Sequence, residues 1–204
     1  LEFRRVLFRS ADGQYYDFSG SANENEAASL ILSFNNPGEE QEAKLFIRAK
    51  NSGWSSIVNH EYTLLLGKAY RSFRNLQERT SAEKMEKELL KQEIPIKVYA
   101  ENNGQWEFAG YFPLVGTENF REMVLPVPIK NNKERTVRLK LETAFRFWDI
   151  DNAAIDFSKD PDLTPVAVKA ISIRHSVKGE VNTALESIDK EYVQLSDKEY
   201  VDLS

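Results

Sequence analysis

Hydrophobic and polar residues alternate with a period of two from Gln14 to Lys50. The alternating apolar positions are Tyr16, Phe18, Leu30, Leu32, Phe34, Leu45 and Ile47. This period is typical of β-strands that turn one face to a core and the other to solvent. The run Asn35-Asn36-Pro37-Gly38 predicts a turn between two of these strands.

A helical period replaces the alternation between about Ser55 and Glu93. Apolar residues at spacings of three and four form a single stripe, made of Val58, Tyr62, Leu65, Leu66, Ala69, Phe73 and Leu76. Thr80 and Glu83 match a capping box, and Pro95 predicts the end of the segment. We expect the stripe to pack on the rest of the domain. The alternative is a partner or membrane-surface helix, which the mixed charges of the polar side disfavour.

The period of two returns after Ile94. Pro126 and Pro128 place one of the strands at a sheet edge, because proline cannot donate to a ladder. The predicted strands are 96–100, 106–110, 123–127, 136–142 and 145–157, with a hairpin turn at Asn102-Asn103-Gly104. About eight strands without βαβ alternation predict a mainly β fold. We expect an antiparallel β-sandwich of jelly-roll type with a helical insertion at about 55–93.

Residues 161–204 form a separate tail after the sandwich segment, which we place at 11–160. We predict a strand from Val166 to Ile173 in this tail. A near-repeat follows, Asp189-Lys190-Glu191-Tyr192-Val193 against Asp197-Lys198-Glu199-Tyr200-Val201. Two copies are too few to define a repeat array, although they allow the start of one. We favour two short strands paired with each other at the periphery, at the start of a following element that is cut short.

The first ten residues, LEFRRVLFRS, match the translation of an adapter used for short-read sequencing libraries. We therefore treat 1–10 as foreign to the protein and expect them to be exposed and irregular, or a short helix with few contacts. Their arginines are accordingly not interpreted as part of a signal peptide or a basic arm. Without this segment the formal net charge changes from −5 to −7, because three Arg and one Glu are removed.

Charge and composition exclude several classes of function. The acidic balance argues against a nucleic-acid or anionic-membrane partner. The chain has no Cys, which rules out disulfides, thiolate zinc sites and cysteine nucleophiles. No apolar run approaches the roughly 20 residues of a membrane span, so we expect no membrane insertion.

Several runs between Ile94 and Ser158 carry a family resemblance. They are IKVY at 96–99, GQWE at 104–107, RTVRLKL at 135–141 and WDIDNAAID at 148–156. This pattern resembles galactose-binding-like jelly rolls, the β-sandwich of discoidin domains and many carbohydrate-binding modules. The resemblance covers about a third of the chain and implies an uncharacterised module of a bacterial protein, extracellular or at the cell surface. The helical insertion departs from the usual fold of that family.

Catalytic and metal sites have weaker support in the sequence. His60 and His175 lie far apart and outside any nucleophile, metal or phosphate motif, so we assign both to structural roles. Asp149 and Asp151 share one face of a predicted strand, and further aspartates follow at 156, 160 and 162. This acidic string makes calcium a candidate ligand, although no Asp-x-Asp-x-Asp-Gly loop is present.

Aromatic side chains near turns are the candidates for a glycan site. Sugar rings stack on exposed aromatic faces beside amide or carboxylate groups, and the positions that fit are Trp54, Trp106, Tyr111 and Phe112. We expect a non-catalytic accessory module that binds a glycan or other domains of a larger protein. A purely structural spacer is the alternative if all four side chains are buried. A glycan-active hydrolase is the second alternative, and it needs two carboxylates about 5–10 Å apart in an open cleft.

Overall fold

The computed structural model describes residues 6–9, 14–19, 27–37, 42–130, 136–159, 163–166, 168–185 and 192–204. The chain divides into two compact units, Leu1–Lys159 and Asp160–Ser204, and each is described by itself. The first unit holds the predicted sandwich and its helices, and the second holds a small sheet.

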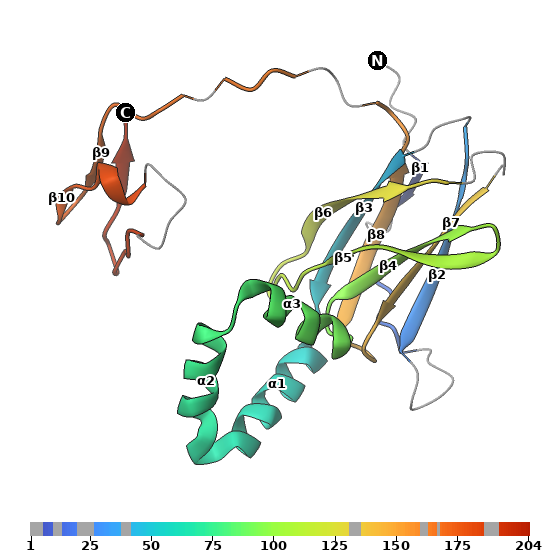
Figure 1. The fold of residues 1–204 in the computed structure, drawn as a ribbon, viewed down its shortest axis with the longest axis horizontal. Helices are drawn as coiled ribbons and strands as arrows, with labels where there is room; N and C mark the ends of the chain where they lie inside the picture. The colour runs from blue at the N-terminus through green and yellow to red at the C-terminus, as the bar shows by residue number, and fades with distance from the viewer. Residues whose placement is uncertain are drawn as a thin grey trace. The chain divides into compact units, whose positions relative to one another are not determined.

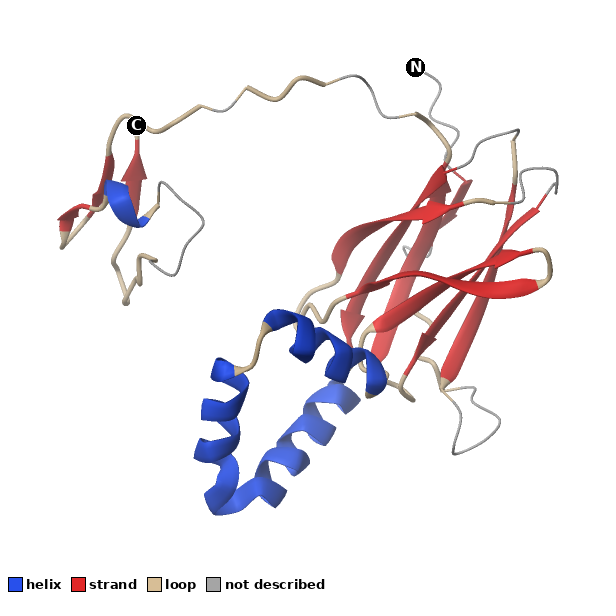
Figure 2. Cartoon of the chain, viewed as in Figure 1, coloured by secondary structure: helices blue, strands red, loops and turns tan. Residues whose placement is uncertain are grey.

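The first unit is a sandwich of two four-stranded antiparallel sheets (Figure 1, Figure 2). One sheet has the order β1-β8-β3-β6, with β1 at Val6–Arg9, β8 at Trp148–Asp156, β3 at Glu42–Asn51 and β6 at Arg121–Pro128. The other has the order β2-β7-β4-β5, with β2 at Ala28–Asn35, β7 at Thr136–Thr143, β4 at Ile96–Asn102 and β5 at Gln105–Phe112. The pairs 1–8, 2–7, 3–6 and 4–5 form the double Greek key of a jelly roll. The predicted fold class is confirmed.

The core lies between the two sheets, where the alternating apolar residues meet. On β7, Val137, Leu139 and Leu141 are at most 5% exposed, while the residues between them face outward. On β8, Trp148 is fully buried, and its indole N–H donates to the Ile94 carbonyl at 2.8 Å. Strand β6 pairs only with β3 in the described sheets, which confirms the edge position predicted from its prolines.

The insertion between β3 and β4 is helical, as predicted. It contains α1 (Gly53–Leu66), the short 3-10 helix η1 (Gly67–Ala69), α2 (Tyr70–Arg79) and α3 (Ala82–Lys91). The predicted capping box is displaced by one residue, because the Thr80 hydroxyl donates to the Leu76 carbonyl at the end of α2. Ser81 caps α3 instead, with its hydroxyl accepting from the Lys84 amide at 3.4 Å. Within the described residues, no helix is both long and apolar enough to cross a membrane.

The prediction that the apolar stripe packs on the sandwich is wrong. Tyr62, Leu65 and Leu76 are 50%, 85% and 65% exposed. The reason is that α1 and α2 extend away from the end of the sandwich and return as a hairpin (Figure 1). Tyr62 and Phe73 meet edge to face at 5.9 Å between ring centres, so these two helices pack on each other. Residues 53–79 therefore form a projecting helical arm.

The prediction for the N-terminal segment is also wrong where the structure describes it. Val6–Arg9 form the edge strand β1, which pairs with β8 in the register Val6↔Ile155. Val, Leu and Phe are strand formers, and an unpaired edge of β8 offers them backbone hydrogen bonds. Tyr16 continues along the same edge, with two backbone hydrogen bonds of 2.9 Å to Ile150. Residues 1–5 and 10 lie outside the described residues.

The second unit contains a three-stranded sheet of order β10-β9-β11, with β9 at Ile173–His175, β10 at Gly179–Glu180 and β11 at Val201–Leu203. A 3-10 turn, η2, covers Asn182–Ala184. The strand predicted from Val166 is wrong up to Ser172 in the described positions, since its apolar residues Val166, Val168 and Ile171 are at least 82% exposed. Only three residues from Ile173 are strand.

The predicted hairpin between the two repeat copies does not form. In the second copy, Val201 pairs with His175 of β9, whereas Tyr192 and Val193 belong to no strand. The rest of the first copy, 189–191, lies outside the described residues. The buried ring of His175 accepts from the amides of Val177 and Lys178 at 3.0 and 3.1 Å, which fixes the turn after β9. The Ser176 amide also donates to the Tyr200 carbonyl at 2.9 Å, beside the pairing of β9 with β11.

Candidate functional site

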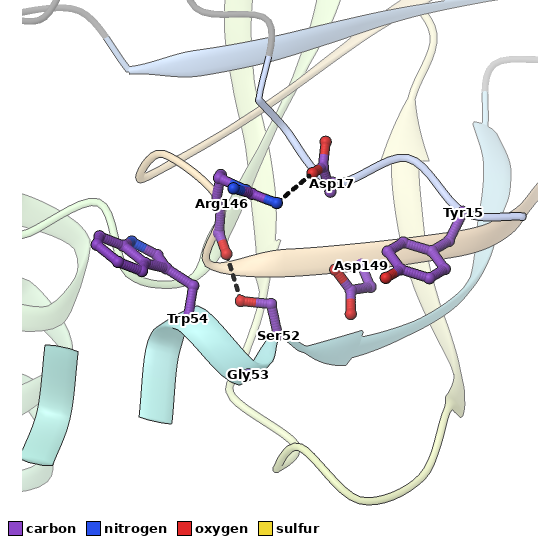
Figure 3. Close-up of a pocket in the computed structure, with 7 residues that line it drawn as sticks. All are labelled: Tyr15, Asp17, Ser52, Gly53, Trp54, Arg146 and Asp149. Carbon is purple, nitrogen blue, oxygen red and sulfur yellow. Dashed lines mark hydrogen bonds and ion pairs between the residues drawn. The ribbon is translucent and has the colours of Figure 1, made fainter. Parts of the chain in front are cut away.

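A pocket of about 110 Å³ opens where β3 passes into α1 (Figure 3). Three segments far apart in the sequence meet there: the strand-to-helix junction, the start of β8, and the segment before β2. The residues that line it are Tyr15, Asp17, Ser52, Gly53, Trp54, Arg146 and Asp149. Two aromatic rings, two carboxylates and one guanidinium therefore face a single hollow.

Asn51 and Ser52 hold the junction in place. The Asn51 side-chain oxygen accepts from the amides of Val115 and Gly116, both at 2.9 Å. Ser52 is the N-cap of α1, where its hydroxyl accepts from the Ser55 amide at 3.2 Å. The same hydroxyl donates to the Arg146 carbonyl, which ties the helix to the turn before β8. The start of α1 is therefore fixed against both neighbouring loops.

Trp54 lies in the first turn of α1, and its side chain is 43% exposed. Among the described backbone amides, only that of Ser55 donates to the Ser52 hydroxyl. The amides of Gly53 and Trp54 therefore have no hydrogen-bond partner within the helix, as is usual in a first helical turn. Figure 3 shows Trp54 at one end of the group of side chains and Tyr15 at the other, with the polar residues between them. Tyr15 is 54% exposed. Both rings are open to a ligand.

Asp17 and Arg146 form the polar wall of the pocket on one side. The guanidinium of Arg146 lies 3.2 Å from the Asp17 carboxylate, and the Ser19 amide donates to that carboxylate at 3.1 Å. Hydrogen bonds from Ser19, together with Arg146, hold the pKa of Asp17 below its usual value. Arg146 adopts a left-handed backbone conformation with φ of 55°, which an ordinary side chain rarely takes. Asp17 is therefore an ionised and well-partnered carboxylate.

Asp149 is the opposite case. The residue is 6% exposed, and within the described part of the chain its carboxyl makes no hydrogen bond and no ion pair within 4 Å. Burial raises the pKa of Asp149, and the nearby Asp17 acts in the same direction. Lys50 and Arg146 act against this rise. The residue as a whole is buried, but its carboxyl oxygens remain accessible from the pocket, where water or a ligand can donate to them. A carboxyl of raised pKa in a pocket wall is a candidate for a role in binding.

The four predicted aromatic residues do not gather at one site. Only Trp54 lines the pocket. Trp106 is half-buried on the outer face of β5, with the cationic groups of Arg138 and Lys140 at 5.5 and 5.6 Å from its ring centre. Tyr111 is half-buried on the same strand, where burial and a hydrogen bond with Glu86 of α3 raise its pKa.

Phe112 is a correction to the predicted site. The side chain is 2% exposed and belongs to the hydrophobic core, so it is unable to stack on a ligand. It is the last residue of β5 and pairs with Ile96, the first residue of β4, which is also buried. Successive side chains of a strand point to opposite faces of the sheet, and the side chain at this position points to the core.

The two predicted calcium ligands take different roles. Asp151 is paired with Arg48 across the sheet at 3.4 Å, whereas Asp149 faces the pocket. Among the described residues, no group of three or more His, Asp or Glu side chains is placed to hold a metal ion. Asp160 and Asp162 lie outside the described residues.

Several pocket residues were missed in the sequence. Tyr15, Asp17 and Arg146 come from segments that meet only in the folded jelly roll, so local patterns had no means of joining them to Trp54. Ser52 carried a readable signal, because a Ser before a helical run is a preferred N-cap. That signal marks the start of α1 and hence the place of Trp54.

Comparison with known proteins adds little. No family model matches the chain, and no curated protein matches it. One similar solved structure is a family GH115 4-O-methyl-alpha-glucuronidase with specificity for decorated arabinogalactans, with 11% identity and a TM-score of 0.36. The match covers 78% of this chain and 18% of that chain, so this chain spans less than a fifth of its neighbour's length. A TM-score this low carries no argument, and the site rests on its own geometry.

Proposed function

We propose that this chain is a non-catalytic, carbohydrate-binding module of galactose-binding-like type from a larger secreted or cell-surface bacterial protein. The observation that carries the proposal is the pocket itself: Trp54 is 43% exposed and shares a hollow with the carboxyl of Asp149, which has no hydrogen-bond partner among the described residues. The spacer alternative assumed that all candidate aromatic side chains are buried, and Trp54 is not.

The chemistry of the pocket suits a sugar ring. The face of a pyranose carries C–H groups that pack on an indole or phenol ring, while its rim carries hydroxyls. Trp54 and Tyr15 offer two such rings, and carboxylate oxygens accept hydrogen bonds from hydroxyls without needing a proton of their own. Small-molecule sites commonly combine apolar walls with a few converging polar groups. The pocket has this combination on a rigid strand and helix start.

The test is a binding experiment on the full chain. A glycan array identifies a binding oligosaccharide, and calorimetry then compares the wild type with Trp54→Ala. We expect Trp54→Ala to weaken binding at least ~10-fold, because truncating a stacked Trp typically costs ~2 kcal/mol or more. Phe108→Ala is the matched control, since Phe108 is a comparably exposed aromatic, at 53%, on β5 and outside the pocket.

Two outcomes contradict the proposal. If no oligosaccharide binds, or if both alanine variants bind like the wild type, the pocket is not a glycan site and the spacer alternative gains. Because two carboxylates, Asp17 and Asp149, line the pocket, the same samples are also assayed for new reducing ends after incubation. Release of sugar that is lost in Asp149→Asn identifies a hydrolase instead.

A further inference from the structure

Asp149 is a carboxyl that a ligand in the pocket meets directly. Its residue is 6% exposed and its oxygens open into the hollow without a hydrogen-bond donor among the described residues, so water or a ligand supplies the donors. A carboxylate accepts and never donates when it is ionised. The hydroxyl groups of a neutral sugar can donate to the two carboxylate oxygens of Asp149, and two adjacent hydroxyls can donate to both oxygens at the same time.

The charges around the pocket leave little room for a second anion. Asp17 already occupies the guanidinium of Arg146 at 3.2 Å. The amine of Lys50 lies 5.1 Å above the ring of Phe120, and Lys50 does not line the pocket. A ligand carboxylate in the hollow therefore meets two protein carboxylates and one guanidinium that is already paired. Lys50, the cross-strand neighbour of Asp149 on β3, is a second cation but acts from outside the lining.

The start of α1 acts in the opposite direction. Gly53 and Trp54 of its first turn line the hollow, and a helix N-terminus favours anions. That attraction is spread over partial charges, whereas an ionised Asp149 carries a whole charge in the pocket wall. At equal distance the whole charge has the larger effect. The hydroxyl oxygens of a neutral sugar can also accept from the amides of this turn.

We infer that the pocket selects neutral sugar rings and discriminates against uronic acids, with Asp149 as the specificity-determining residue. This inference rests on the proposed function, because it concerns ligands of the same pocket. A neutral ring stacks on Trp54 and donates two hydroxyls to Asp149, while a ring with a carboxylate loses affinity by repulsion. The rise in the pKa of Asp149 with burial agrees with this assignment, since lower pH weakens its role as acceptor.

The experiment uses a pair of ligands that differ at one carbon. The probe is a neutral oligosaccharide that binds on the array, together with the same oligosaccharide whose terminal hexose is oxidised at C6 to a carboxylate. Calorimetry at pH 7 should give at least ~10-fold weaker binding for the oxidised form, a difference of about 1.4 kcal/mol. Asp149→Asn should weaken binding of the neutral form and reduce the difference between the two ligands to ~3-fold or less.

Asp151→Asn is the control, because Asp151 lies on the same strand, pairs with Arg48 and does not line the pocket. It should leave the ratio of the two affinities unchanged. Equal or tighter binding of the oxidised ligand to the wild type overturns the inference while the proposed function stands. If the wild type binds neither the neutral nor the oxidised oligosaccharide in calorimetry, both the inference and the proposed function are overturned. The wild-type comparison needs no variant, so a misfolded Asp149→Asn protein does not weaken the test.

Discussion

Replacing the buried carboxyl should stabilise the protein while it damages the site. Asp149 is 6% exposed, and the described residues offer its carboxyl no hydrogen bond. Burial of a polar group without a partner costs about 1–3 kcal/mol in protein mutational data, and only part of this applies here because the Asp149 oxygens reach the solvent of the pocket. Lys50 and Arg146 offset part of this cost through their charges. For Asp149→Asn we therefore expect a gain in the free energy of unfolding of roughly 0.5–1 kcal/mol at pH 7, below the full penalty of an unpartnered buried group.

The pH dependence of that gain has a definite sign. Burial raises the pKa of Asp149 in the folded state, so the folded protein holds this proton more tightly than the unfolded chain does. The stability that this group contributes is fully present below its unfolded pKa of about 3.9 and is lost as the pH rises through the higher folded value. Asn does not titrate. The advantage of Asp149→Asn should therefore grow from acid to neutral pH.

The assay is thermal unfolding of the full chain between pH 4 and pH 8, followed by far-ultraviolet circular dichroism. One kcal/mol corresponds to roughly 2–4 °C in the melting temperature for a protein of this size. Asp151→Asn serves as the comparison, because it breaks a partly exposed ion pair with Arg48 and should cost about 0–1 kcal/mol. If Asp149→Asn destabilises the protein at pH 7, or if its effect does not change with pH, the carboxyl has a structural partner and the argument fails.

Two further predictions concern the core and the arm. Trp148→Leu should destabilise the sandwich by about 2–5 kcal/mol in urea unfolding, because it leaves a cavity at a fully buried position and removes the indole donor from the Ile94 carbonyl. A loss below ~1 kcal/mol would contradict the packing of Trp148 in the core. Leu65→Lys should change the stability by no more than ~0.5 kcal/mol, because Leu65 is 85% exposed on the projecting arm. A loss of several kcal/mol would show that the arm packs on the sandwich.

The jelly roll was predictable because its signals are local. The stretch Thr136–Thr143 alternates at every position, and its inward residues are the buried ones in the structure. The turn at Asn103-Gly104 was equally clear, since both residues take positive φ, at 53° and 76°, as a tight hairpin requires. Pro126 and Pro128 marked an edge strand, and β6 is one.

The failed predictions share a different cause. A stripe at Val58, Tyr62 and Leu65 shows that a helix is amphipathic, but not which surface covers it; here α2 covers only part of it. The N-terminal Val6–Arg9 likewise has strand propensity whatever its origin, and an open edge of β8 suffices to pair it. Which surface covers an apolar stripe, or pairs with a strand, depends on the tertiary structure, and the period of the sequence carries no information on it.

The helical insertion is the element that makes the pocket. The resemblance to galactose-binding-like jelly rolls treats it as a departure from the fold, yet its first turn places Trp54 beside the start of β8. Ser52 caps that turn and donates to the Arg146 carbonyl, and Arg146 in turn binds Asp17 at 3.2 Å. One serine therefore connects the insertion to the polar wall that Arg146 and Asp17 form. The proposed ligand site therefore depends on the insertion, and if the proposal holds, variation at the β3–α1 junction should change ligand preference before it changes the sandwich.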